Sequence, residues 1–180
     1  MSRIIIITGE LASGKSTLAR NLSNNLDIPF VTKDDIKEHL ADTVGFKDRT
    51  ENRLLSIQAV KEIIKQVEAH LKKNEGFIIE ANFRTNELEN IDKLVDQYES
   101  EAFLFCITGN DELLYERFLA RIPTRHKAHL SMGLEHSFAN FKEYQDMLRK
   151  QNLVFPVHKI EIDNLNEQQV LEKAIKLLGY

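Results

Sequence analysis

The sequence contains few of the residues that build covalent or metal-held scaffolds. Its 180 residues include one cysteine, three prolines, seven glycines and no tryptophan. The single cysteine, Cys106, excludes an intrachain disulfide and a cysteine zinc site, and its place in the apolar run AFLFCI predicts a small buried side chain. No linker rich in glycine or proline, repeat or low-complexity tract divides the chain. We therefore expect residues 1–180 to form one domain.

Long apolar runs and a surplus of positive charge are also absent. No stretch reaches the roughly 18 residues of a membrane helix, and the isoleucines of residues 4–7 fall short of the roughly 7–15 residues of a signal-peptide core. The 24 basic and 28 acidic residues give a net charge of -4, which argues against general binding of nucleic acid. We expect a cytoplasmic protein without a membrane partner that holds any anionic ligand locally.

Five short runs of β-branched and aromatic residues alternate with helical segments. The runs read IIIIT, IPFVT, GFIIEA, EAFLFCIT and FPVHKIEI. Each is followed by apolar residues at helical spacing. This alternation predicts a three-layer α/β/α fold with a mostly parallel five-stranded sheet.

The clearest helix is predicted near residues 50–73, with a stop at residues 74–76. Its expected apolar stripe consists of Leu54, Ile57, Val60, Ile63, Ile64, Val67 and Leu71. Residues that indicate other helix starts are Thr32, Thr85, Asn110 and either Asn164 or Asn166.

The stretch GELASGKST, residues 9–17, directly follows the first apolar run. Gly9, Gly14, Lys15 and Ser16 match the pattern G-x-x-x-x-G-K-[ST] in full, between a predicted strand and a predicted helix. Glycines let consecutive backbone N–H groups point inward, and the helix that begins near Lys15 adds the positive end of its dipole. The pattern therefore predicts a phosphate cradle that binds a nucleoside triphosphate.

The side chains of the cradle have separate expected tasks. Lys15 is expected to reach the outer phosphates, and the Ser16 hydroxyl to ligate the Mg2+ that bridges them. Thr17 can add a hydroxyl contact one step inward. The predicted nucleotide-binding residues of this stretch are Gly9, Glu10, Leu11, Ala12, Ser13, Gly14, Lys15, Ser16 and Thr17.

Two carboxylates, Asp34 and Asp35, stand where the second strand ends and a helix begins. Ligands of open α/β sheets bind at this carboxyl edge, so one of the pair is a candidate base that accepts a proton from a hydroxyl acceptor. The other is expected to interact only with the helix dipole. Lys37, one turn on, is either an anchor for an anionic acceptor or a solvated side chain.

The third run ends in Glu80, beside the strand that leads into the cradle. An acid in this position is placed to support the water shell of the metal, as a Walker-B acid does. Asn82 and Phe83 follow on the same edge. Asn82 is a candidate substrate contact, whereas Phe83 is expected to pack in the core.

Residues 120–137, here called the basic segment, interrupt the alternation and predict an exposed loop or a lid. Arg117, Arg121 and Arg125 approach or lie in it at a spacing of four. Arg121 and Arg125 are expected to neutralise charge on the γ-phosphate in the transition state, and Arg117 to lie nearer the nucleoside base. The alternative is ordinary pairing with the helix dipole. The segment's histidines, His126, His129 and His136, are expected to contact phosphate or acceptor rather than zinc.

In order and spacing, GELASGKST, KDDIK, FIIEANF and ERFLAR…TRH resemble the small P-loop kinases grouped with the AAA-type ATP-binding families, including polynucleotide kinase and chloramphenicol phosphotransferase-like kinases. The resemblance covers nearly the whole chain. It implies ATP and Mg2+ as cofactors, Asp34 as the base that activates the acceptor, and Arg117 near adenine, with Arg121 and Arg125 near the phosphates. Lys37 stands where arginine is frequent, which weakens the case for a phosphate-bearing acceptor because bidentate recognition is lost.

These observations together indicate a kinase that transfers the γ-phosphoryl group of Mg-ATP to a hydroxyl of a small molecule. The acceptor pocket is expected between the edge at Asp34 and the helices of residues 35–75. Two alternatives stay open: a kinase of nucleic-acid 5′ ends, which the absence of a long basic run disfavours, and an ATP-binding or ATPase switch protein without an acceptor. The sequence leaves open the acceptor, the choice of ATP or GTP, and the oligomeric state.

Overall fold

The structure, a computed structural model, describes residues 2–129 and 133–180. Its strands are β1 (Arg3–Gly9), β2 (Phe30–Thr32), β3 (Phe77–Glu80), β4 (Glu101–Thr108) and β5 (Val157–Glu161). Its α-helices are α1 (Lys15–Leu26), α2 (Lys33–Val44), α3 (Arg49–Lys72), α4 (Thr85–Gln97), α5 (Asp111–Arg121), α6 (Phe138–Arg149) and α7 (Glu167–Leu177). Two short 3-10 helices, η1 (Ile122–Thr124) and η2 (Leu134–His136), lie in the basic segment. The five predicted strands are thus confirmed.

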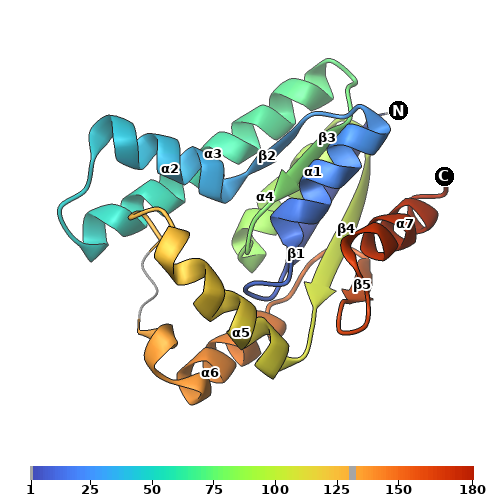
Figure 1. The fold of residues 1–180 in the computed structure, drawn as a ribbon. Coiled ribbons are helices and arrows are strands. Elements are labelled where there is room, and N and C mark those ends of the chain that lie inside the picture. Colours follow the sequence, from blue (N-terminus) through green and yellow to red (C-terminus); the bar gives the residue numbers. More distant parts are fainter. Residues whose placement is uncertain (1, 130–132) are drawn as a thin grey trace.

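The five strands form one sheet in the order β2-β3-β1-β4-β5, and every neighbouring pair is parallel. The chain leaves β1 near the middle of the sheet and builds first toward β2 and β3, then toward β4 and β5 (Figure 1). The loop after β1 therefore lies at the point where the strand order reverses. In open parallel sheets, ligands bind at this position.

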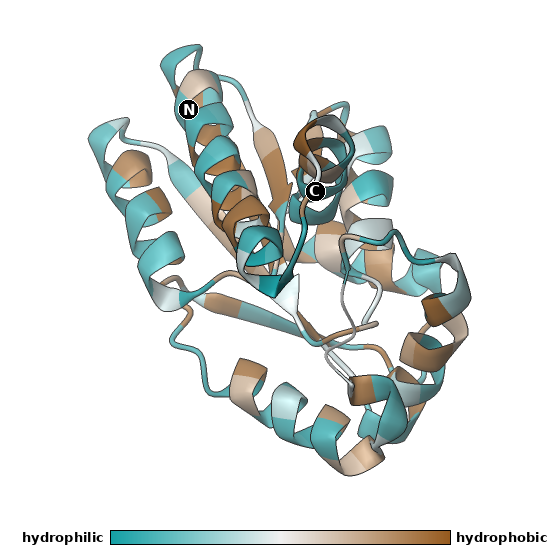
Figure 2. Cartoon of the chain, turned by 90° about the vertical axis from the view of Figure 1, so that its left-hand side faces the viewer, coloured by the Kyte–Doolittle hydropathy of each residue, from teal (hydrophilic) through white to brown (hydrophobic). Residues whose placement is uncertain are grey.

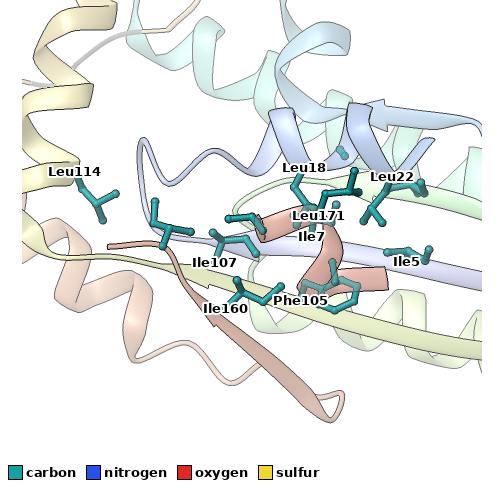
Figure 3. Close-up of a cluster of buried hydrophobic side chains, with 14 of the residues drawn as sticks. Ile5, Ile7, Leu18, Leu22, Phe105, Ile107, Leu114, Ile160 and Leu171 are labelled. Carbon is teal, nitrogen blue, oxygen red and sulfur yellow. The ribbon is translucent and has the colours of Figure 1, made fainter. Parts of the chain in front are cut away.

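Alternate residues of β1 supply the cores on the two faces of the sheet. Ile5 and Ile7 pack with residues of α1, α5, α6 and α7, and Figure 3 shows this cluster around Leu18 and Phe105. Ile4 and Ile6 pack with residues of α3 and α4. In Figure 2, hydrophobic residues are concentrated on the strands, and hydrophilic residues dominate the helix surfaces. The helices on both faces confirm the predicted α/β/α layers and hold the loop after β1 on a rigid base.

Helix α3 follows the predicted range, but its buried face changes along its length. From Val60 onward the predicted stripe is correct, because Ile63 and Val67 pack under the sheet. In the first half the prediction is wrong: Leu54 is 54% exposed, whereas Leu55 is buried. This half packs on α2 instead of the sheet, so a different face is covered.

The helix starts follow the predicted caps closely. The Thr32 side chain accepts a hydrogen bond from the Asp35 N–H, and Asn110 caps α5. Asn166, not Asn164, caps α7, and the cap of α4 is Arg84, one residue before the predicted start. None of the described helices combines the length and the apolar character that a membrane span requires.

The basic segment is not simply an exposed loop. Helix α5 runs to Arg121 and is followed by η1, and the Ala128 residue is fully buried against α2 and α3. Figure 1 shows the chain after α5 reaching these two helices. The expected lid also includes residues 130–132, which lie outside the described residues.

Candidate functional site

The loop between β1 and α1 has a backbone that requires glycine at its first position. Gly9 has a φ of 129°, and a Cβ atom there would lie 2.1 Å from the carbonyl oxygen of Ile107 in β4. Gly14 caps α1 with a φ of 85°, and Ala12 also adopts a positive φ, 59°. Left-handed residues turn successive N–H groups toward one side, which forms an anion-binding concavity at the start of α1.

Helix α6 holds this loop in place through two side chains. Arg149 donates from Nε to Glu10 Oε1 at 2.6 Å and also pairs with Asp111 and Asp146. Gln145 accepts from the Leu11 N–H at 2.9 Å. The Glu10 side chain is almost fully buried and takes a further hydrogen bond from the Gly109 N–H. No local pattern predicts this support from α6, because more than 130 residues separate the partners.

The cradle's lysine and serine lie beside the acid at the end of β3. Lys15 Nζ donates to the carbonyl oxygen of Glu10 at 2.6 Å, and Ser16 Oγ donates to Glu80 Oε2 at 3.0 Å. Burial lowers the pKa of Lys15, which the nearby Glu80 charge opposes. Burial likewise raises the pKa of Glu80, with Lys15 acting in the opposite direction. A hydroxyl and a carboxylate this close fit the oxygen ligands and bound waters that Mg2+ prefers.

A large cavity of about 970 Å³ extends from the cradle across the carboxyl edge of the sheet. Among its described walls are all the predicted candidates from Leu11 to Thr17, together with Asp34, Lys37, Glu80 and Asn82. Its basic side chains are Lys15, Lys33, Lys37, Arg84, Arg117, Arg121 and Arg125, and its acidic ones are Asp34, Glu80 and Glu167. Basic side chains therefore outnumber acidic ones on the described wall of this cavity, a charge balance that favours an anionic ligand.

The structure distinguishes the two carboxylates that open α2. Asp34 lines the cavity, whereas Asp35 is exposed and is not among the described residues that line it. Asn82 lies on the same edge, and its Oδ1 atom is buried without a hydrogen-bond partner among the described residues. Phe83 is buried in the core beneath, as expected.

The three arginines of α5 and the basic segment all line the large cavity. The Arg125 guanidinium lies 5.6 Å from the centre of the Phe118 ring, and burial lowers its pKa. Ile162 and Leu165, which come from the chain after β5, also line this cavity. Lys33 and Arg84 are further cations of this wall to which sequence reasoning gave no role; Lys33 opens α2 and Arg84 directly precedes α4.

The Lys37 side chain is buried, and two of the three N–H donors of its ammonium group are used within the protein. It is 8% exposed, and its Nζ donates to Asn52 Oδ1 at 2.9 Å and to the Ala128 carbonyl oxygen at 2.7 Å. Asn52 Nδ2 also donates to the Ala128 oxygen. Burial lowers the pKa of Lys37, and the nearby Asp34 charge acts in the opposite direction. These bonds fix the basic segment to α2 and α3.

A smaller cavity of about 370 Å³ adjoins Asp34 on the side of the basic segment. The described residues that line it are Asp34, Glu38, Arg121, Thr124, Arg125, His126 and His129. Two of the segment's histidines therefore meet carboxylates of α2. Within the described residues, no group of three or more histidine, cysteine and acidic side chains is arranged to hold a metal ion.

The parallel sheet, the cradle after its central strand and the acid at the neighbouring strand end define the class of P-loop α/β proteins with a kinase-like fold. An AAA domain model matches residues 5–147, and the chain belongs to this family. The predicted relation to the small P-loop kinases is thereby confirmed.

Solved structures with this fold include several kinases. A presumed kinase from Chloroflexus aurantiacus is 23% identical, with a TM-score of 0.82 over 97% of each chain. Shikimate kinase from Aquifex aeolicus is 18% identical, with a TM-score of 0.58 over 98% of this chain and 96% of that one. A gluconokinase from Sinorhizobium meliloti is 14% identical, with a TM-score of 0.59 over 97% and 90%. The search of curated proteins gave no match.

Proposed function

We propose that the protein is a kinase that transfers the γ-phosphoryl group of ATP to a hydroxyl group of a small molecule. The observation that carries this proposal is the single cavity onto which the cradle, the Ser16–Glu80 pair, Asp34 and two arginines all open. The kinase-like fold supports it, and similar structures include kinases of shikimate and gluconate by name. Because ATP is the phosphoryl donor, we assign the protein to the cytoplasm.

Each part of the cradle has a task in this reaction. The N–H groups at the start of α1 bind phosphate oxygens, and Lys15 leaves the Glu10 carbonyl to neutralise the β- and γ-phosphates. Ser16 would ligate Mg2+ directly and Glu80 would hold one of its waters. The bound ion supplies charge neutralisation between the β- and γ-phosphates. Arg117, which lines the same cavity, is assigned to the nucleoside base.

Asp34 is the base of the proposed reaction. Its carboxylate lines both cavities, so it lies between the nucleotide and the space beside α2. As the acceptor oxygen forms its bond to phosphorus and the bond to ADP breaks, Asp34 accepts the hydroxyl proton. Arg121 and Arg125 line the same two cavities and neutralise charge on the transferring group.

The acceptor is assigned to the smaller cavity rather than to the space between Asp34 and residues 35–75 that the sequence suggested. This cavity adjoins Asp34, and its described walls are charged or polar. Lys37, which the sequence offered as an acceptor contact, already uses two donors within the protein. Asn82 lines the large cavity and stays the candidate substrate contact there, because its buried Oδ1 atom has no hydrogen-bond partner among the described residues.

The test compares Asp34→Asn with the matched variant Asp35→Asn. Each protein is incubated with Mg-ATP and a pooled metabolite extract, and new phosphorylated species are followed by mass spectrometry. Asp34→Asn is expected to lower transfer by roughly 100-fold or more, while Mg-ATP affinity stays within a few-fold. Asp35→Asn retains transfer because its side chain is exposed. Full transfer by Asp34→Asn contradicts the assignment of the base.

The two alternatives give different results in the same assay. A kinase of nucleic-acid ends phosphorylates an added 5′-hydroxyl oligonucleotide instead of a metabolite, with binding that weakens steeply as salt rises. A switch protein releases ADP at a rate that neither the extract nor the oligonucleotide changes. Either result overturns the proposal of a small-molecule kinase.

A further inference from the structure

His129, a residue of the basic segment, has no part in the mechanism proposed so far. Its side chain is 8% exposed and lies between two carboxylates of α2. His129 Nε2 is 2.8 Å from Glu38 Oε1, whereas Nδ1 is 3.7 Å from Asp34 Oδ1. Asp34 and Glu38 are four residues apart, so both project from the same face of the helix. The imidazole thus adjoins the proposed base directly.

The backbone around His129 is fixed by several hydrogen bonds. The His129 N–H donates to the His126 carbonyl at 2.9 Å, which closes a tight turn. Within that turn, the Ala128 carbonyl accepts from Lys37 and Asn52, and the Ala128 N–H donates to His126 Nδ1. The position of the imidazole against α2 is therefore set by groups on α2 and α3 rather than by its own contacts alone.

The two distances from the imidazole indicate different roles for its nitrogen atoms. The 2.8 Å contact with Glu38 is that of an N–H donating to a carboxylate, which places the proton of the neutral ring on Nε2. Nδ1 then carries a lone pair toward Asp34. The 3.7 Å separation there is beyond hydrogen-bond distance, as expected when an acceptor nitrogen faces an ionised carboxylate.

We propose that His129 relays the proton that Asp34 takes from the acceptor; this inference rests on the proposed kinase function. The acceptor O–H bond breaks, its proton goes to Asp34, and the oxygen bonds to phosphorus as the bond to ADP breaks. Protonated Asp34 then donates to His129 Nδ1 and transfers the proton. The products are ionised Asp34 and an imidazolium between two carboxylates, and the imidazolium later releases its proton to water. His129 acts through Asp34 and regenerates the base.

Other charged groups near His129 act on this transfer in opposite directions. The carboxylates of Asp34 and Glu38 favour the imidazolium. Arg121 from the end of α5 and Arg125 from the basic segment line the same cavity and oppose it. The His126 ring lies 6.4 Å away, with its Nε2 paired with Asp42, and the Lys37 ammonium lies at the neighbouring Ala128 carbonyl.

The first test needs no acceptor. Long-range proton–nitrogen NMR of the whole protein with labelled histidine reports which ring nitrogen carries the proton at about pH 8. The proposal requires the proton on Nε2 of His129, with Nδ1 bare. A proton on Nδ1 overturns the proposal, because that nitrogen would then have no lone pair to accept the proton from Asp34. This result stands even if the proposed kinase activity fails.

The second test compares His129→Gln with the control His39→Gln, using Mg-ATP and the pooled metabolite extract. His39 is an exposed histidine of α2 that is not among the described residues of either cavity. Glutamine keeps an amide beside Glu38 but cannot take up a proton. For His129→Gln we expect kcat to fall roughly 10- to 100-fold at about pH 8 with unchanged KM for ATP. The difference should shrink at about pH 5.5, where a protonated imidazole cannot accept. If His129→Gln loses the same fraction of kcat at both pH values, the side chain has only a packing role and the relay is overturned. If the wild-type protein makes no product, the kinase function itself is overturned.

Discussion

At the scale of single residues, the buried charges of the cradle have a measurable effect on the free protein. Lys15 is 9% exposed, and burial lowers its pKa below the ordinary value of 10.5. The unfolded chain then binds more protons than the folded one between the lowered pKa and 10.5. The free energy of unfolding therefore rises with pH across that window through this residue. Near neutral pH, the buried charge of Lys15 in the cradle therefore lowers the free energy of unfolding of the free protein.

Lys15→Met removes this contribution. The variant is expected to be more stable than wild type at about pH 7, and its advantage should shrink as the pH approaches 10, because the wild-type lysine then folds in its neutral form. Urea denaturation at several pH values measures both proteins. Lys65→Met, at a side chain that is 74% exposed, is the control and should change stability equally at every pH. An advantage of Lys15→Met that stays constant with pH would contradict the role of burial.

The motif residues could be predicted from the sequence, whereas their supports could not. Gly9, Lys15, Ser16 and Glu80 meet in the structure because strand ends fix their spacing, and a local pattern records that spacing. Arg149 has no such pattern, since it meets Glu10 from a helix 139 residues away. The contacts of Lys37 with the Ala128 carbonyl likewise depend on how the basic segment packs, which no periodicity encodes.

At the scale of elements, α6 stabilises the cradle loop. Among the described residues, removing Arg149 leaves the Glu10 carboxylate, whose side chain is 3% exposed, with the Gly109 N–H as its remaining hydrogen-bond donor. We expect Arg149→Met to lower the free energy of unfolding by about 2–4 kcal/mol. This loss stays below the largest values for a fully buried ion pair because Arg149 is 33% exposed. Adding Glu10→Gln should recover part of this loss, since the uncompensated charge is gone. Urea denaturation of the single and double variants and of the exposed control Lys150→Met measures these free energies. If the losses of Arg149→Met and Glu10→Gln simply add in the double variant, the pairing is refuted.

Helix α3 shows why a stripe read from sequence can be right in one half only. A helix has a single apolar face only where it packs on a single surface, and α3 passes from α2 to the sheet. Leu55→Ala is therefore expected to cost about 2–4 kcal/mol, because the side chain is 4% exposed. Leu54→Ala, one residue away, should change stability by less than about 0.5 kcal/mol. Equal effects of the two substitutions in thermal denaturation would contradict the observed phase of the helix.

At the scale of the whole molecule, seven of the 24 basic residues line the described wall of one cavity, against three acidic residues. A nucleotide that binds there links its binding to folding. A ligand that binds only the folded state adds about 2.7 kcal/mol at 100 times its Kd. For a chain of 180 residues this raises Tm by about 5–10 °C. We expect such a shift with Mg-ATP and a smaller one with ATP and a chelator, because Ser16 and Glu80 fit a metal beside the cradle. The measurement is differential scanning fluorimetry at fixed ATP.

Ser16→Ala separates the metal contribution from the rest of the cradle. Without the hydroxyl, the shift with Mg-ATP should fall to the value that ATP gives with a chelator, while that lower value stays unchanged because the N–H groups and Lys15 remain. Ser23→Ala on the same helix, which is not among the described residues of the cavity wall, should keep both shifts. A Ser16→Ala protein with the full magnesium-dependent shift would remove Ser16 from the metal site. The metal would then depend on Glu80 and the phosphates alone.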